Sequence, residues 1–171
     1  QRLADVVAGW FVPAVIADYQ REVGRAAIDA GADLILGHHA HILKGAEVYK
    51  DRTILYSLGN FAVDLRMDKA HAESKGFKEV QVLHPDWVPD FESLYNFPPE
   101  SRMTMIAESR LDKHSAPQVA IRPCYINRNA QPELVAPDDA RFEQIVQYMR
   151  RISSAQGLAV PAQSPPQPAK K

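Results

Sequence analysis

A helix-length amphipathic stretch followed at once by a short apolar run constrains the fold more than any other feature. Over residues 14–30, apolar side chains such as Tyr19 and Val23 recur at three- and four-residue spacing, the period of an α-helix. Pro13 precedes this stretch and Gly31 follows it, as suits the two ends of a helix. Residues 33–37 then have the length and apolar content of a buried, parallel strand. This order predicts an α/β layer.

The rest of the chain adds two predicted strand pairs and one more helix. Residues 46–49 and 53–57 are expected to form two strands joined by a turn at residues 50–52, and residues 118–126 are expected to be the partner strand of residues 103–109. A second helix is predicted over 138–154, with Asp138 or Asp139 as its N-cap. Its predicted apolar face consists of Phe142, Ile145, Val146, Met149 and Ile152.

The domain organisation follows from length and proline content. A chain of 171 residues suits one domain or a piece of one, and residues 1–157 are assigned to it. Residues 64–100 contain four prolines and mixed charge, which predicts a long insertion with little regular structure; their aromatic residues favour a folded lid or a packed loop. The Pro-rich tail, residues 158–171, is expected to be disordered.

Composition excludes several kinds of partner. The net charge is −1 and the basic residues are dispersed, so nucleic acid is not an expected partner. No apolar run reaches the roughly 18 residues of a membrane span. Cys124 is the only cysteine and lies in an apolar run, which favours a buried, inert thiol.

A cluster of three histidines follows the apolar run at once. His38, His39 and His41 lie just after the predicted strand, where open α/β sheets bind their ligands. Imidazole binds Zn, Mn or Fe, and the His-Xaa-His spacing lets two rings approach one ion or a pair of ions. Surface histidines without a ligand remain the alternative. The single histidines His71, His84 and His114 are expected to be solvated.

Three motifs carry a resemblance to a known family. They are Ala-Gly-Ala-Asp at residues 30–33, Gly-His-His-Ala-His at 37–41 and Tyr-Ser-Leu-Gly-Asn-Phe at 56–61. In order and spacing, residues 19–64 resemble the CapA family, named for poly-γ-glutamate capsule synthesis. Ala40 stands where the family has proline.

The resemblance implies a fold and a metal centre. The family is similar to calcineurin-like metallophosphatases, which implies a four-layer α/β/β/α sandwich with two divalent metal ions, Mn, Zn or Fe. His39 and His41 match the histidine pair of that centre and are expected to be metal ligands with a catalytic role. His38 is expected as an additional ligand or a neighbour of the ligands, and Asn60 as a catalytic residue close to the site.

The chain also departs from the family pattern. The aspartate and asparagine elements of the superfamily would precede residue 1, and Ala8-Gly9-Trp10 stands where the family has His-Trp-Gly. The chain begins with Gln1. It is therefore expected to be the C-terminal portion of such a protein, truncated at its N-terminus.

Several functions are compatible with these features. One is a metal-dependent hydrolase acting on a phosphate ester or an amide-type polymer linkage. Another is a non-catalytic component that binds an anionic polymer or holds other capsule-synthesis subunits, and a third is an inactive fragment. The resemblance implies a phosphorylated substrate or an anionic polymer as partner, and a location at the cell surface or on a membrane.

Overall fold

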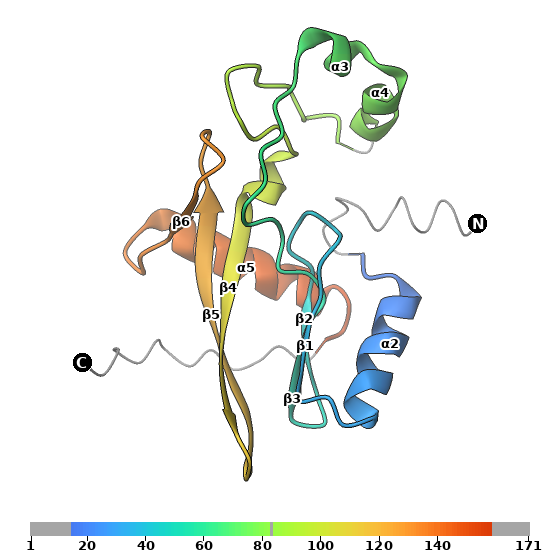
Figure 1. The fold of residues 1–171 in the computed structure, drawn as a ribbon, viewed down its shortest axis with the longest axis vertical. Helices are drawn as coiled ribbons and strands as arrows, with labels where there is room; N and C mark the ends of the chain where they lie inside the picture. The colour runs from blue at the N-terminus through green and yellow to red at the C-terminus, as the bar shows by residue number, and fades with distance from the viewer. Residues whose placement is uncertain (1–14, 83, 159–171) are drawn as a thin grey trace.

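Two small three-stranded sheets and two principal helices form the body of the molecule (Figure 1). The computed structural model describes residues 15–82 and 84–158. Pro13 and the tail from residue 159 onward thus lie outside the described residues. At the level of class, the described fold is mixed α/β, as predicted. The four-layer sandwich that the resemblance implies stays a prediction.

The first sheet has the strand order β1-β3-β2. Strand β1 (Leu34–Leu36) runs parallel to β3 (Arg52–Leu55), and β2 (Ala46–Tyr49) runs antiparallel to β3. The parallel strand and the hairpin are therefore confirmed. The expectation that the apolar run is buried is wrong in part, since β1 lies at the edge of the described sheet and Leu36 is 48% exposed.

Helix α2 (Asp18–Asp29) precedes β1 and packs on the first sheet. It begins four residues later than predicted. The face turned to the sheet also differs from the prediction. Gly24 and Ile28 are buried, and Gly24 lies against Ile54, whereas Tyr19 and Val23 are exposed. Glycine at position 24 lets the helix approach the sheet closely, so the packing selects this face rather than the more apolar one.

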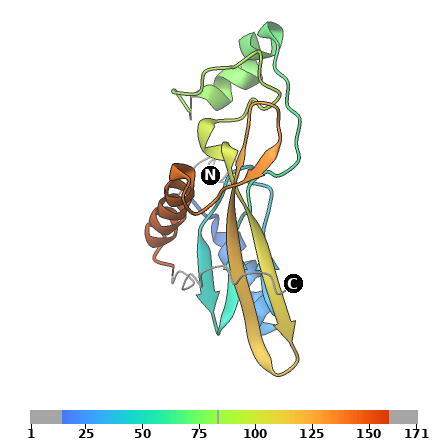
Figure 2. The ribbon, with the colours of Figure 1, turned by 90° about the vertical axis from the view of Figure 1, so that its left-hand side faces the viewer.

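The second sheet is dominated by a long hairpin. Strands β4 (Met103–Asp112) and β5 (Ser115–Ile126) pair antiparallel, and both extend beyond their predicted ends. Their tip projects away from the body in both views (Figure 2). A short strand that was not predicted, β6 (Pro132–Leu134), pairs with β5. Cys124 in β5 is buried, as predicted, and burial raises the pKa of its thiol.

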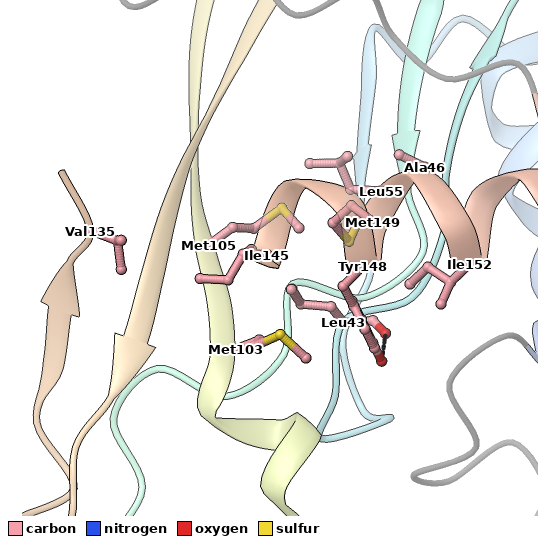
Figure 3. Packing of buried hydrophobic residues seen from close by; sticks show 10 residues of the cluster. All are labelled: Leu43, Ala46, Leu55, Met103, Met105, Val135, Ile145, Tyr148, Met149 and Ile152. Carbon is pink, nitrogen blue, oxygen red and sulfur yellow. Dashed lines mark hydrogen bonds between the residues drawn. The ribbon is translucent and has the colours of Figure 1, made fainter. Parts of the chain in front are cut away.

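The main core lies where α5 (Ala140–Ser154) packs against residues of both sheets (Figure 3). The predicted apolar face of this helix is confirmed, and Tyr148 joins it. Asp139 caps the helix by accepting a hydrogen bond from the Arg141 N–H (2.8 Å). The buried core cluster comprises Leu43, Ala46, Leu55, Met103, Met105, Val135, Ile145, Tyr148, Met149 and Ile152.

Residues 64–100 are more regular than predicted. They contain helices α3 (Lys69–Glu73) and α4 (Lys75–Gln81), and the 3₁₀ turn η1 (Pro99–Arg102) follows. The side chains of Asp68 and Ser74 accept hydrogen bonds from the first turns of α3 and α4, which explains how such short helices form. A separate small cluster stabilises this segment: Met67, Ala72, Phe77 and Trp87.

Two further observations concern the start of the predicted tail and the possibility of a membrane-spanning helix. Leu158, the first residue of the predicted tail, is buried and packs in a cluster with Ile16, Ile28 and Ile54. Among residues 15–82 and 84–158, no helix combines the length and apolar character that crossing a membrane requires.

Candidate functional site

The histidine loop, residues 38–41, begins directly after β1 and is held against the end of β3. The Gly37 N–H donates to the Leu55 carbonyl (2.6 Å), and the Leu58 N–H donates to the Gly37 carbonyl (3.1 Å). A Cβ at position 37 would lie 2.3 Å from the Tyr56 carbonyl oxygen, so this approach requires glycine. The loop is thus anchored at the carboxyl end of β1, the expected place for a ligand site.

Two histidines of the loop have an unusual backbone conformation. His39 and His41 adopt left-handed φ angles of 81° and 59°. Such angles cost an L-residue roughly 1–2 kcal/mol, and residues held in them cluster at functional sites. Ala40 between them is buried beside Ile42. The loop therefore buries its alanine, while His39 is exposed and His41 is half-buried.

His41 and Asn60 form a two-point contact. The Nδ1 atom of His41 lies 2.8 Å from Oδ1 of Asn60, and Nδ2 of Asn60 donates to the His41 carbonyl (3.2 Å). Asn60 is 8% exposed, so little water competes for these bonds. This pairing fixes the orientation of the His41 ring, as carboxylate, carbonyl or amide groups do for metal-binding histidines.

Two aromatic residues of the 64–100 segment extend this contact: Phe97 packs on His41, and Tyr95 bonds to Asn60. The ring of Phe97 stacks on His41, with ring centres 5.2 Å apart and planes inclined by 24°. The hydroxyl of Tyr95 accepts from Asn60 Nδ2 (2.8 Å) and donates to the Ser101 carbonyl (2.7 Å). Tyr95 is fully buried, and this burial raises the pKa of its hydroxyl.

The structure thus places the four predicted site residues on two adjacent loops. His41 and Asn60 are joined directly, whereas His38 and His39 lie on the same loop with exposed side chains. Sequence reasoning missed Tyr95 and Phe97. The run of aromatic residues at 95–97 indicated a packed segment, but no local signal connects them with Asn60, which lies 35 residues away from Tyr95.

Glu47, which lies between the motifs at residues 37–41 and 56–61, has a structural role. Glu47 is 5% exposed and pairs with Arg25 of α2 (2.5 Å), and Tyr56 donates to its other oxygen (2.6 Å). The pair ties α2 to the first sheet. Burial and the Glu47 contact together raise the pKa of Tyr56.

Among the described residues, few side chains at this site are suited to bind a metal ion. Within the part of the chain that the structure describes, no group of three or more His, Cys, Asp or Glu side chains is arranged to hold a metal ion. His39 and His41 offer suitable imidazole donors, yet a two-ion centre needs bridging carboxylates as well. Of the single histidines, His71 and His114 are exposed as predicted, whereas His84 is half-buried and burial lowers its pKa.

Comparison with known proteins covers the same region of the chain. Residues 13–65 match the family model described as bacterial capsule synthesis protein PGA_cap. The PGA biosynthesis protein CapA of Bacillus subtilis (strain 168) is 57% identical over 47 residues, which are 28% of this chain and 12% of that protein. The capsule biosynthesis protein CapA of Bacillus anthracis is 53% identical over 45 residues, 26% of this chain and 11% of that protein.

A third relative is the uncharacterized protein y4sH of Sinorhizobium fredii, 54% identical over 48 residues, 28% of this chain and 10% of that protein. The chain therefore matches only about a tenth of the length of these relatives. The residues matched by the family model include the histidine loop, Asn60 and the whole first sheet. Over this segment, residues 13–65, the chain is therefore similar to proteins of the CapA family.

Proposed function

We propose that this chain belongs to a protein of bacterial capsule synthesis and that its histidine loop supplies part of a divalent metal centre for hydrolysis. The observation that carries the proposal is the pairing of His41 with Asn60 inside the family-matched segment. By this proposal the substrate is a phosphate ester or an amide-type polymer linkage, and the whole protein works at the cell surface. The four-layer sandwich of the metallophosphatases belongs to the same proposal.

The chemistry of the loop supports a role for two histidines as ligands. His39 and His41 flank a buried alanine on a loop at the end of a strand, and Asn60 orients one of the two rings. A pair of Mn, Zn or Fe ions bound there would activate water and stabilise negative charge on the substrate. The chain's own contribution is to hold the ring of His41 in one orientation between Asn60 and Phe97.

The first test is metal binding by the full 171-residue chain. Because the described residues supply an incomplete ligand set, calorimetric titration with Mn²⁺ or Zn²⁺ should show weak binding, micromolar or poorer. We expect His39→Gln and His41→Gln each to weaken it further. His114→Gln is the matched control, since this exposed histidine lies in the turn between β4 and β5.

Two results would contradict this proposal. Equal binding by the wild-type chain and both loop variants would exclude the loop as a ligand source. Stoichiometric binding of two ions at nanomolar concentration would show a complete centre rather than a partial one.

A non-catalytic role is the second candidate, and the small number of ligands in the described residues favours it. In that case the chain binds an anionic polymer such as poly-γ-glutamate or holds other capsule-synthesis subunits. Co-sedimentation with poly-γ-glutamate separates the two candidates. Binding that is unaffected by a chelator and by the His39→Gln/His41→Gln double substitution supports the polymer-binding role, and loss of binding in both cases supports the metal site.

A further inference from the structure

We propose that Tyr95 is a positioning residue that acts through Asn60 to set the tautomer of His41, with the proton on Nδ1 and the lone pair on Nε2. The residue comes from the 64–100 segment, outside the region matched by the family model. The inference deepens the proposed function and rests on it only for the identity of the ligand, a metal ion.

The direction of each hydrogen bond follows from the last acceptor in the chain. The Ser101 carbonyl can only accept, so the Tyr95 hydroxyl donates to it (2.7 Å). The hydroxyl oxygen then accepts from its other neighbour, Asn60, at 2.8 Å, and a group that donates must be the amide Nδ2. A second contact agrees, because Nδ2 also faces the His41 carbonyl at 3.2 Å.

The orientation of the amide determines which ring nitrogen holds the proton. With Nδ2 turned toward Tyr95, Oδ1 of Asn60 faces Nδ1 of His41 at 2.8 Å. An amide oxygen only accepts, so Nδ1 must carry a hydrogen. In the neutral ring the lone pair is then on Nε2, and a histidine binds a metal ion through the nitrogen that is not protonated.

The hydrogen bonds from His41 through Asn60 and Tyr95 to the Ser101 carbonyl form a chain, here called the relay, and packing holds it in place. Tyr95 and Ser101 are fully buried. Arg102 donates to the Tyr95 carbonyl (3.0 Å) and to the Ile126 carbonyl (3.0 Å), and its guanidinium lies over the Tyr95 ring at 5.2 Å. These contacts attach the end of the 64–100 segment to the second sheet. The relay therefore connects the histidine loop with a rigid part of the molecule rather than with a free loop.

The test replaces only the hydroxyl group. Tyr95→Phe keeps the ring but removes one of the two described contacts that hold Nδ2 of Asn60 in this orientation, and leaves only the longer bond to the His41 carbonyl (3.2 Å). Tyr56→Phe is the matched control, because it removes a buried hydroxyl that donates to Glu47 and takes no part in the relay. Asn60→Asp is the second variant, and its carboxylate keeps an acceptor opposite Nδ1.

The primary measurement is the tautomer of His41 in the metal-free chain. Long-range ¹H–¹⁵N spectra, which distinguish the two ring nitrogens, are recorded at mildly alkaline pH, with His41→Gln to assign the signals. Wild type, Tyr56→Phe and Asn60→Asp should show the Nδ1–H form, and Tyr95→Phe a mixture of both forms. An Nε2–H form in the wild type, or an unchanged spectrum for Tyr95→Phe, would overturn the inference.

Zinc binding gives a second measurement. Tyr95→Phe should weaken Zn²⁺ binding about tenfold relative to wild type and Tyr56→Phe, as loss of a group that orients a ligand typically does. If the tautomer shifts but neither protein binds Zn²⁺, the relay stands and the proposed metal centre fails. If the tautomer shifts and the affinity does not change, the part of the inference that concerns the metal is wrong. Should Tyr95→Phe fail to fold, an Nε2–H form in the wild type would still overturn the inference.

Discussion

At the scale of single residues, a buried lysine lies three positions after the histidine loop. Lys44 is 1% exposed, and burial lowers its pKa from 10.5 to about 8. Taking an ammonium group out of water is unfavourable, so the charged form of Lys44 lowers the stability of the fold at neutral pH. Because the pKa of Lys44 is lowered, the loss of folding stability that its charge causes becomes smaller as the pH rises.

We predict that Lys44→Met raises the free energy of unfolding at pH 7 by roughly 1–3 kcal/mol. Between pH 8 and 10.5 the unfolded wild-type chain holds the lysine proton and the folded chain does not, so wild-type stability rises with pH there. The advantage of the variant should therefore be full below pH 8 and shrink toward pH 10.5. Urea denaturation across this range measures it, with Lys113→Met, an exposed lysine of the turn between β4 and β5, as control. A constant difference between Lys44→Met and wild type at all pH values would contradict the assignment.

At the scale of elements, helix α5 depends on the residue before its first turn. Asp138 and Asp139 are both plausible N-caps in sequence, and the structure selects Asp139, whose side chain accepts from the Arg141 N–H. Asp139 also pairs with the Arg141 side chain, which lowers the pKa of this carboxylate. Because α5 contributes much of the main core, fraying of its first turn affects the whole fold.

Asp139→Ala should consequently lower the thermal unfolding midpoint by a few degrees, since one N–H of the first turn loses its acceptor. Asp138→Ala is the matched control and should leave the midpoint nearly unchanged, because Asp138 is exposed. Calorimetry of the two variants side by side measures the difference. An equal fall in the unfolding midpoint of both variants would contradict the assignment of Asp139 as the N-cap of α5.

At the scale of the whole molecule, apolar side chains are exposed on one helix and on the edge strand beside it. Tyr19 and Val23 of α2 are 56% and 64% exposed, and Leu36 of β1 is 48% exposed. Strand β1 has one pairing partner in the described sheet, β3. Exposed apolar residues and an open strand edge both favour association between chains.

We therefore expect the 171-residue chain to dimerise or to be poorly soluble. Tyr19→Lys/Val23→Lys should shift it toward the monomer, because two charges on one face of α2 disfavour burial of that face. Light scattering over a range of protein concentrations measures the effect, with Val88→Lys as control, a 78% exposed valine of the 64–100 segment. A monodisperse wild-type monomer at all concentrations would contradict the expectation.

Features that depend on neighbours close in the chain can be predicted from the sequence alone. The hairpin of β2 and β3, the strand after α2, the N-terminal region of α5 and the burial of Cys124 all follow from local periodicity and turn residues. The histidine spacing is likewise visible in sequence, and so is the family-matched segment that contains it.

Which surfaces and side chains meet depends on packing between segments that are distant in the chain. The choice of the Gly24 face of α2 over the Tyr19 face depends on close approach to Ile54, which no local pattern reports. Tyr95 reaches Asn60 across 35 residues, because Arg102 and the core of the second sheet hold its segment against the histidine loop. Contacts of this kind arise from packing between distant segments, so their energies are not encoded in any short stretch of sequence.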